Sequence, residues 1–350
     1  MSPRLRYLCS AAFLVSAAGA LFAQGSQIRG PVQPFVFDTP TRSLRAINGM
    51  PGFSSLGPAS VDLPGSAFGA VSPSGKLAVA CGTGETPCVL ISTSAFAIQA
   101  ELPGGPFAAD SAPDGAAWSS DNNQLVLYSR SLNRLRSYSG LITSTPRLDL
   151  DLELPDLSAA TFGPSGDLLA ATSKPDGAGL FRLSTDAAPQ LLVELANPGS
   201  IAVSSKNGLF VYNRDTGRIE RYAMWTTGNG NIAAVAPDDT WRFDQLMNST
   251  VSLLAARDSR GREVLWVANS PGESEGAVLL GLDPSSGELL QAFNLAFQPN
   301  RLEPSGADNF LLFARSAEGE PFWCLSLAQA EPKVYFVPAG AVATTGGQLQ

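Results

Sequence analysis

The side chains that most often carry out chemistry in proteins are scarce in this sequence. Its 350 residues include no histidine and four cysteines. Without an imidazole, the chain cannot build a Ser-His-Asp or Cys-His catalytic group, a histidine zinc site or a histidine proton shuttle. The absence of histidine therefore rules out much hydrolase chemistry.

One glycine-rich stretch, GAVSPSGKL, resembles a phosphate-binding loop but does not have its spacing. Five residues rather than four separate Gly69 from Gly75, and Leu77 follows Lys76 where a phosphate loop needs Ser or Thr. The acidic stretches DPSSGE and DSRGRE are too short for an EF-hand calcium loop. All three are better explained as turns between strands.

Two cysteines, Cys81 and Cys88, lie at the ends of CGTGETPC, which connects the apolar runs KLAVA and VLIST. If these runs are neighbouring antiparallel strands, the two thiols face each other, and an oxidising compartment permits a bond. We predict a disulfide between them. The alternative is a pair of small buried residues, because the spacing does not match a redox or zinc motif. Cys324 is interpreted as a core residue.

The N-terminus has the pattern of a secretory signal peptide. Arg4 and Arg6 precede an apolar run that ends near Ala23, where small residues suit a signal peptidase. A membrane anchor is the weaker alternative, because the run is shorter than the roughly 20 residues that span a bilayer. We predict a cleaved signal peptide over residues 1–23, a linker over 24–33, and a secreted or periplasmic protein with no transmembrane span after cleavage.

The composition suits an all-β protein with many turns. The chain is 44% hydrophobic and 15% charged, with 34 Gly and 26 Pro. Its formal net charge of −8 argues against a nucleic-acid partner, because phosphate binding needs a concentrated basic surface.

Turns that join two apolar runs recur along the chain at intervals of 42 to 53 residues. Four strand-length runs per unit, at this period, are typical of a β-propeller blade. Helical repeats fit poorly, because the runs are short, rich in Val, Leu, Phe and Tyr, and broken by Gly, Pro, Asn and Asp. The six turns are marked by Gly75, Asn123, Gly166, Gly208, Gly261 and Gly306.

A further hairpin, FVFDTPTRSLRAI, precedes the six units and has no strand pair of its own before it. It predicts a ring in which the two ends of the chain complete one blade together, which leaves no open sheet edge. We predict one propeller domain over residues 34–338, of four-stranded antiparallel blades, with seven blades and six as the alternative. Residues 223–250 must hold a long loop or an irregular blade, and 339–350 a flexible tail.

The phrases VSPSGKLAVA, FGPSGDLLAA and LDPSSGELLQAF resemble the repeats of bacterial YVTN/YncE-type and TolB-like, WD40-like β-propellers. The similarity covers roughly residues 34–338. The chain lacks the YVTN tetrapeptide, the Gly-His and Trp-Asp pairs of WD40 repeats and the double glycine of kelch repeats. The resemblance is therefore to the superfamily, and it implies export more than an activity.

Propellers that resemble gluconolactonases hold a divalent metal with Glu, Asn and Asp side chains around the central channel. This resemblance suggests a lactonase-like, metal-dependent hydrolase as the alternative function, with Ca²⁺ or Mg²⁺ in the channel. Residues of these types also commonly cap turns. The candidate ligands near predicted inner strands are Asp110, Asp244, Asn248, Asn300 and Glu303.

The preferred interpretation is a monomeric, noncatalytic binding scaffold without a cofactor. Propeller loops gather on one face, where exposed aromatic and arginine side chains contact a protein or small-ligand partner. Trp225, Trp241 and Arg301 are the candidate contacts. Trp118 and Trp266 lie within strand-like runs and are expected to pack between blades.

Overall fold

The computed structural model describes residues 34–339, apart from short gaps. The predicted signal peptide, the predicted linker and residues 340–350 of the predicted tail lie outside this range. The described residues contain no helix that is long and apolar enough to cross a membrane. The gaps are 174–177, 207, 224, 227–231, 234–236, 244–245, 247–249, 272–275 and 307, and the side chains of 225–226 and 232–233 are not described either.

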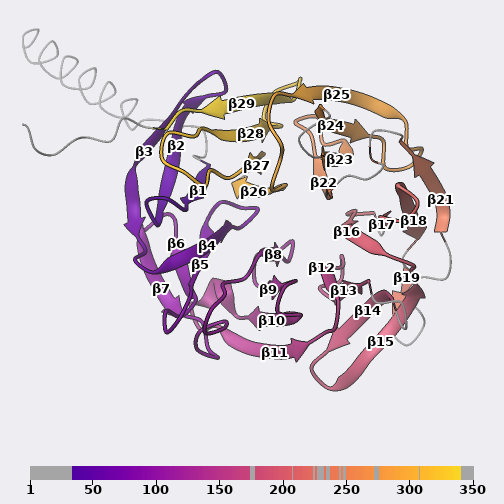
Figure 1. The fold of residues 1–350 in the computed structure, drawn as a ribbon, viewed down its shortest axis with the longest axis horizontal. Helices are drawn as coiled ribbons and strands as arrows, with labels where there is room; N and C mark the ends of the chain where they lie inside the picture. The colour runs from indigo at the N-terminus through magenta and orange to yellow at the C-terminus, as the bar shows by residue number, and fades with distance from the viewer. Residues whose placement is uncertain are drawn as a thin grey trace, which may run out of the picture. The chain divides into compact units, whose positions relative to one another are not determined.

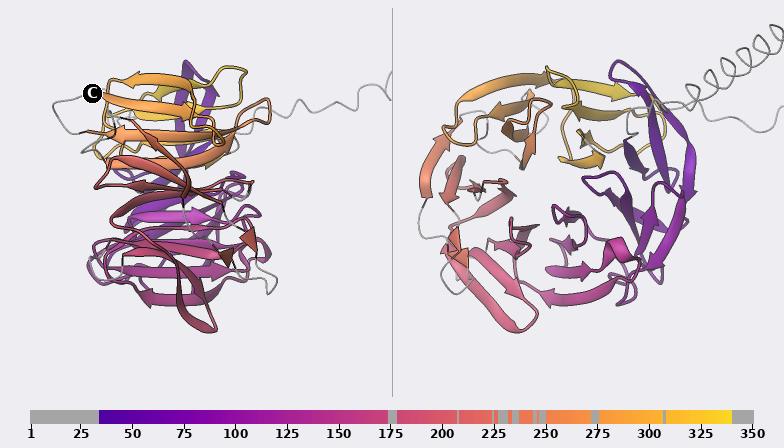
Figure 2. Two further views of the ribbon diagram at one scale, coloured as in Figure 1. Left: turned by 90° about the vertical axis from the view of Figure 1, so that its right-hand side faces the viewer. Right: turned by 180° about the vertical axis from the view of Figure 1, so that it is seen from behind.

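The elements of the described chain are β-strands and one short 3₁₀ turn, η1 (Leu141–Thr143), and Leu246 is also in 3₁₀ conformation. Seven sheets stand around a central axis like the blades of a propeller (Figure 1). The views from the side and from behind show the same ring of sheets (Figure 2). Seven blades are thus confirmed over the alternative of six. Each of six sheets has four antiparallel strands, and the N-terminal sheet has three within the described residues.

The strands of each sheet follow one another from the axis outward. The N-terminal sheet holds β1 (Phe35–Asp38), β2 (Ser43–Met50) and β3 (Phe53–Asp62). The next sheet holds β4 (Ser66–Val71), β5 (Leu77–Gly82), β6 (Val89–Ser92) and β7 (Ala97–Glu101). Then come β8 (Gly115–Trp118), β9 (Leu125–Ser129), β10 (Arg134–Ser139) and β11 (Arg147–Glu153). The fourth sheet holds β12 (Leu157–Phe162), β13 (Leu168–Thr172), β14 (Gly179–Ser184) and β15 (Ala187–Glu194).

The other three sheets repeat this order with one insertion. The fifth sheet holds β16 (Pro198–Val203), β17 (Gly208–Asn213), β18 (Arg218–Ala223) and β21 (Pro237–Arg242). A separate hairpin of β19 (Trp225–Thr226) and β20 (Ile232–Ala233) is inserted before β21. The sixth holds β22 (Thr250–Arg257), β23 (Glu263–Ser270), β24 (Ala277–Leu282) and β25 (Leu289–Leu295). The last holds β26 (Glu303–Gly306), β27 (Asn309–Phe313), β28 (Phe322–Ser326) and β29 (Lys333–Val337).

Burial follows from this radial stacking. Every residue of β5 (LAVACG) and β13 (LLAAT) is buried, because second strands are covered on both faces by neighbouring sheets. The outermost strands β7 and β15 are largely exposed. Trp266 is completely buried and Trp118 packs against the cluster between the second and third sheets, as the sequence predicts. Cys324 is also buried, which confirms its interpretation as a core residue.

The ring closes differently from the prediction. The N-terminal hairpin does not share a blade with the C-terminal strands; it pairs with β3, which follows a tight turn at Pro51 and Gly52. The C-terminal strands complete a four-stranded sheet of their own. Closure is therefore side by side, with β1 next to β4 and β26, and β26 next to β4. Sequence reasoning missed β3 because FSSLGPASVD has as many polar as apolar residues and carries Gly and Pro at its centre.

The closing seam is held by an apolar cluster and a buried ion pair. The cluster joins Val36 and Ile47 of the N-terminal sheet to side chains of the last sheet such as Phe322. Beside it, the Arg315 guanidinium donates to Asp38 through Nε at 2.7 Å and Nη2 at 2.5 Å. Asp38 is fully buried and Arg315 is 4% exposed. The seam thus replaces the shared blade that the sequence predicted.

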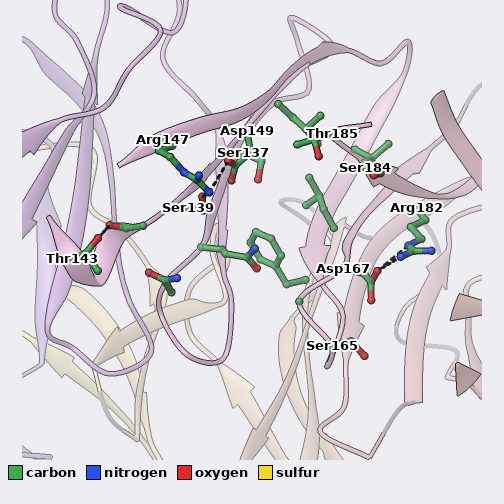
Figure 3. Close-up of a pocket in the computed structure, with 18 of the residues that line it drawn as sticks. Ser137, Ser139, Thr143, Arg147, Asp149, Ser165, Asp167, Arg182, Ser184 and Thr185 are labelled. Atoms are coloured by element: carbon green, nitrogen blue, oxygen red, sulfur yellow. Dashed lines mark hydrogen bonds and ion pairs between the residues drawn. The ribbon is translucent and has the colours of Figure 1, made fainter. Parts of the chain in front are cut away.

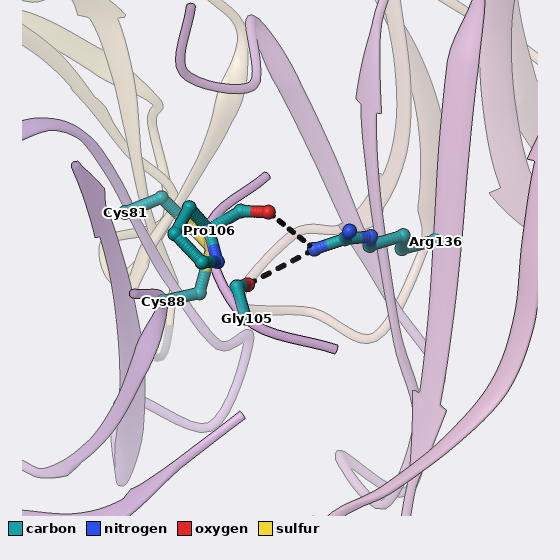
Figure 4. The surroundings of a disulfide bond; sticks show 5 residues. All are labelled: Cys81, Cys88, Gly105, Pro106 and Arg136. Atoms are coloured by element: carbon teal, nitrogen blue, oxygen red, sulfur yellow. Dashed lines mark hydrogen bonds between the residues drawn. A yellow bond between two sulfur atoms is a disulfide. The ribbon is translucent and has the colours of Figure 1, made fainter. Parts of the chain in front are cut away.

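A disulfide joins Cys81, in β5, to Cys88, just before β6, which is the pairing proposed from the sequence (Figure 4). Both sulfurs belong to a buried cluster. Next to it, Arg136 of the following sheet donates from Nη1 to the carbonyl oxygens of Gly105 and Pro106, each at 3.0 Å. These contacts anchor the segment that leads from β7 into the channel strand β8.

Candidate functional site

A cavity of about 640 Å³ lies at one end of the central channel. It is bounded by the innermost strands β8, β16, β22 and β26, which face the centre of the ring in Figure 1. The residues are on the face where first strands begin and second strands end, so side chains from four blades converge there. We call it the channel cavity. Its polar lining includes Asp114, Tyr128, Arg130, Arg214, Ser252, Asn300, Arg301 and Glu303.

Two glycines of the innermost strands let large side chains reach the channel cavity. A Cβ atom at Gly115 would lie 2.2 Å from Cζ of Tyr128. At Gly199, a Cβ atom would lie 2.9 Å from Cδ1 of Tyr212 and 3.2 Å from Nε of Arg214. Real Cβ atoms essentially never come within 3.0 Å of a neighbour, and a contact of 3.2 Å is tighter than most real ones. Tyr128 and Arg214, at the ends of second strands, therefore lie over the innermost strands because these two positions have no side chain.

The phenol of Tyr128 is a free hydrogen-bond donor in the channel cavity. No protein partner of its hydroxyl is found among the described residues. Burial raises the pKa of Tyr128 to about 12. The positive charge of Arg130 opposes that rise in pKa, and the negative charges of Asp114 and Glu303 add to it. The hydroxyl therefore keeps its proton at neutral pH.

The channel cavity has one more cation than it has carboxylates. Arg130 pairs with Asp114, with Nε 3.1 Å from Oδ1, and Arg301 pairs with Glu303, with Nη1 2.7 Å from Oε1. For Arg214, no carboxylate partner is found within the described part of the chain. Partial burial lowers the pKa of Arg214, and the positive charge of Arg130 lowers it further. In a chain of net charge −8, this local positive excess favours an anionic ligand.

Glu303 is held in place through Arg301. Besides binding Glu303, Nη1 of Arg301 donates to the carbonyl oxygen of Gly69 at 3.2 Å, and its guanidinium lies 5.2 Å from the centre of the Phe68 ring. The second carboxylate oxygen of Glu303, Oε2, has no protein partner in the described structure. A fixed carboxylate with one free oxygen can accept a proton from a bound water.

The three predicted metal ligands that the structure describes, Asp110, Asn300 and Glu303, do not assemble into a site. The side-chain amide of Asn300 pairs with the backbone of Ala314 as a neighbouring strand would. Its Nδ2 donates to the Ala314 carbonyl oxygen and its Oδ1 accepts from the Ala314 N–H, each at 2.9 Å. Glu303 is paired with Arg301, and Asp110 does not line the channel cavity. Asp244 and Asn248 lie outside the described residues. Across the described ranges there is no cluster of three or more Asp, Glu, His or Cys that could hold a metal ion.

Two of the three predicted partner contacts, Trp241 and Arg301, also have other roles. Trp241 is 7% exposed and packs against Phe210 and Gly287 in the core, so it is not an exposed anchor. The prediction of an exposed contact at this residue was wrong because Trp241 lies within the outer strand β21 and not in a loop. Arg301 is not in an outer loop but lines the channel cavity. The side chain of Trp225 is outside the described residues.

Sequence reasoning missed Tyr128, Arg130 and Arg214, although a signal for them exists. The second strands of two blades end in the same way, in LVLYSR and LFVYNR, with an arginine two positions after a tyrosine. The last blade has the related LLFAR, which ends in Arg315. The propeller fold places a charged residue at the end of a second strand near one end of the central channel. The role of that residue then depends on which side chain of a neighbouring strand it contacts.

Comparison with solved structures finds similar folds, among them structures that carry the name of a lactonase. The periplasmic gluconolactonase of Pseudomonas aeruginosa matches with a TM-score of 0.56 and 14% identity, over 88% of this chain and 99% of that one. A candidate 6-phosphogluconolactonase of Bacteroides fragilis matches with a TM-score of 0.55 and 13% identity, over 88% and 96%. A protein of unknown function from Desulfotomaculum acetoxidans has a TM-score of 0.56, 14% identity and coverage of 88% and 95%.

No family model matches the sequence, and no curated protein matches it. At identities of 11 to 14% the structural similarity establishes the propeller fold. It also corrects the choice between the two functions weighed from the sequence. Neighbours that carry the names of lactonases favour the hydrolase alternative over the noncatalytic scaffold, so the scaffold prediction was wrong.

Proposed function

We propose that the protein is a lactonase-like hydrolase whose active site is the channel cavity. The observation that carries this proposal is the convergence of three groups without protein partners among the described residues: Oε2 of Glu303, the hydroxyl of Tyr128 and the guanidinium of Arg214. They supply a base, a neutral proton donor and a positive charge. The names of the structural neighbours point to the same reaction class.

In this proposal, Glu303 removes a proton from a water molecule as the water oxygen adds to the lactone carbonyl carbon. The Tyr128 hydroxyl, protonated because of its raised pKa, donates a hydrogen bond to the carbonyl oxygen as that oxygen becomes negative. The ring C–O bond then breaks, and the ring oxygen takes the proton back from Glu303. Water and lactone are converted to a hydroxy acid, and no histidine is needed.

Arg214 determines the substrate class. A guanidinium without a carboxylate partner binds a carboxylate or phosphate well, often through two parallel hydrogen bonds. We therefore propose a lactone that carries a negatively charged substituent. This scheme does not use the predicted Ca²⁺ or Mg²⁺, because the described residues hold no cluster of three or more Asp, Glu, His or Cys that could bind the ion.

The test compares hydrolysis of D-glucono-1,5-lactone and its 6-phosphate by the purified chain, followed with a pH indicator against spontaneous hydrolysis. We expect a higher kcat/KM for the phosphorylated lactone. Glu303→Gln should lower kcat about 10²- to 10⁴-fold, the usual contribution of a general base. Glu288→Gln, in an exposed turn, is the matched control and should be unchanged. Hydrolysis of neither lactone above background, or full activity of Glu303→Gln, would contradict the proposal.

Arg214→Met tests whether Arg214 binds the negatively charged substituent of the lactone or takes part in the reaction at the carbonyl. It should lower kcat/KM strongly for the phosphorylated lactone and little for the neutral one, so that the preference disappears. Equal losses for the two lactones would mean that Arg214 acts on the reacting carbonyl instead of the substituent.

A further inference from the structure

A second cavity, of about 760 Å³, lies on the opposite face of the ring from the channel cavity. It is formed between the β8–β11 and β12–β15 sheets, where first strands end and third strands turn into fourth strands. Figure 3 shows its labelled side chains gathered from the two blades around one opening. No residue lines both cavities, so the two are separate sites. We call it the inter-blade cavity.

Hydroxyl and amide groups dominate the wall of the inter-blade cavity. The β8–β11 sheet contributes Ser137, Ser139 and Thr143, and the β12–β15 sheet contributes Ser165 and Thr185. The amides of Asn123 and Gln124 lie in the same wall. Several of these groups can accept new partners: for Ser165, Thr185 and the Gln124 side chain, no hydrogen bond is found among the described residues. Hydroxyls and amides both donate and accept, so they match a ligand that does the same.

The charges of the inter-blade cavity are paired within the protein. Arg182 lies 2.6 Å from Asp167, and Arg147 lies 3.8 Å from Asp149 and donates to the hydroxyl of Ser139 at 3.2 Å. Two arginines and two aspartates leave no net charge in the lining. Unlike the channel cavity, this one therefore has no excess positive charge to attract an anion.

Apolar side chains form the remaining part of the lining. Phe162 ends β12 and Leu168 begins β13, Leu183 comes from the third strand of that sheet, and Leu150 comes from the neighbouring blade. A cavity with a few apolar surfaces and several convergent polar groups, within roughly 300–1,000 Å³, has the size and character of a small-molecule site. A sugar ring has the complementary surface, because its C–H faces are apolar and its edge carries hydroxyls.

From these three features, we propose that the inter-blade cavity binds a neutral saccharide of one or two rings. Hydroxyl groups of the sugar exchange hydrogen bonds with Ser165, Thr185 and Gln124, while its C–H face rests on the leucine and phenylalanine side chains. Arg182 fixes the Asp167 carboxylate as an acceptor, and Arg147 balances the charge of Asp149, so the lining has no net charge that would prefer an anionic ligand. This proposal is independent of the reaction in the channel cavity.

The test is saturation-transfer NMR and calorimetric titration of the full chain with glucose, maltose, cellobiose, lactose and sucrose. Glucose 6-phosphate and gluconate serve as anionic probes. We expect at least one neutral sugar to bind saturably with a Kd in the millimolar range or tighter, and the anionic probes not to displace it. If no neutral sugar binds, or if the anionic probes compete equally, the proposal is wrong.

The location is tested with Ser165→Trp, which places an indole in the cavity from an exposed turn position. Ser74→Trp, at the same position of the corresponding Pro-Ser-Gly turn two blades earlier, is the matched control. Ser165→Trp should weaken sugar binding at least tenfold, while the control retains it. Retained binding in Ser165→Trp would overturn the assignment to this cavity.

A second variant covers the case in which Ser165→Trp does not fold. Thr185→Val removes one hydroxyl and keeps the side-chain shape, so it should weaken binding about three- to tenfold, the value of one hydrogen bond. Lactone hydrolysis in the channel cavity should be unaffected by this change. Unchanged sugar affinity in both Thr185→Val and Gln124→Leu would also overturn the proposal.

Discussion

Replacing Asp38 by Asn should destabilise the propeller strongly, because Asp38 is the buried anion at the seam where the ring closes. Its carboxylate accepts hydrogen bonds from Arg315, from Nη1 of Arg45 at 3.1 Å and from the Thr41 hydroxyl at 2.6 Å. An Asn side chain would direct amide hydrogens at a guanidinium that is only 4% exposed. Removing one partner of such a buried pair costs about 3 to 5 kcal/mol of unfolding free energy.

The measurement is urea-induced unfolding followed by tryptophan fluorescence. Asp238→Asn is the matched control, because Asp238 pairs with Arg221 at 3.2 Å with 36% and 27% of the side chains exposed. An exposed pair of this kind contributes about 0 to 1 kcal/mol. The double variant Asp38→Leu/Arg315→Met, which removes both charges together, should recover most of the stability lost in Asp38→Asn. A loss below about 1 kcal/mol for Asp38→Asn would refute the assignment of closure to this pair.

The same pair gives a pH dependence with a defined sign. Burial opposes ionisation of Asp38, but hydrogen bonds from Arg315, Thr41 and Arg45 outweigh it and hold the pKa below its ordinary value of 3.8. A group whose pKa is lower in the folded state stabilises that state fully above its unfolded pKa, and this stabilisation is lost as the pH falls through the folded pKa. Unfolding free energy should therefore fall more steeply below about pH 4 in the wild type than in Asp38→Asn.

Two further changes test the disulfide and the shape of the channel cavity. Cys81→Ala/Cys88→Ala removes a disulfide between cysteines seven positions apart and should lower the unfolding free energy by about 2 to 3 kcal/mol. A reductant should no longer shift the melting temperature of this variant. An unchanged unfolding free energy would mean that the covalent bond adds nothing to the strand pairing there. Gly199→Ala should displace Arg214, because the new Cβ would lie 3.2 Å from its Nε. The variant should lower kcat/KM for the phosphorylated lactone more than for the neutral one. Equal kcat/KM values in the variant and the wild type would exclude the steric role assigned to this glycine.

Local pattern was sufficient to predict the blades. Four of the six marked residues, Gly75, Asn123, Gly166 and Gly261, lie between the first and second strands of their sheets, whereas Gly208 is the first residue of β17 and Gly306 is the last residue of β26. Turns of this kind between apolar runs define a hairpin from short-range information alone. Closure was not predictable in the same way. It depends on contacts between residues 277 positions apart, such as Asp38 and Arg315, and on a strand, β3, whose sequence gives no periodic signal.

The candidate site was only partly predictable, and the reasons are also spatial. Glu303 and Arg301 were identified as functional residues and do line the channel cavity, but as partners of each other rather than as a metal ligand and a loop contact. Asn300 was proposed as a ligand from its residue type, yet its amide completes the backbone pairing of Ala314. The residue type and its position along the chain do not reveal which hydrogen-bond partner a polar side chain has in the folded structure.

The second-strand arginines show how one sequence position acquires different functions around a ring. Arg130 and Arg214 end their strands beside innermost strands that carry Gly115 and Gly199, and both guanidinium groups line the channel cavity. Arg315 occupies the same position in the last blade, but its neighbour across the seam is Asp38, so its charge is used for closure. Arg301 combines the two functions, since it binds Glu303 in the channel cavity and the carbonyl of Gly69 on β4. The proposed catalysis and the closure of the ring are therefore coupled: when the seam opens, Arg301 loses the Gly69 carbonyl and the Phe68 ring, which hold its guanidinium against Glu303. Asp38→Asn should consequently lose lactone hydrolysis in step with the opening of the ring, and retained hydrolysis in an open ring would separate the two.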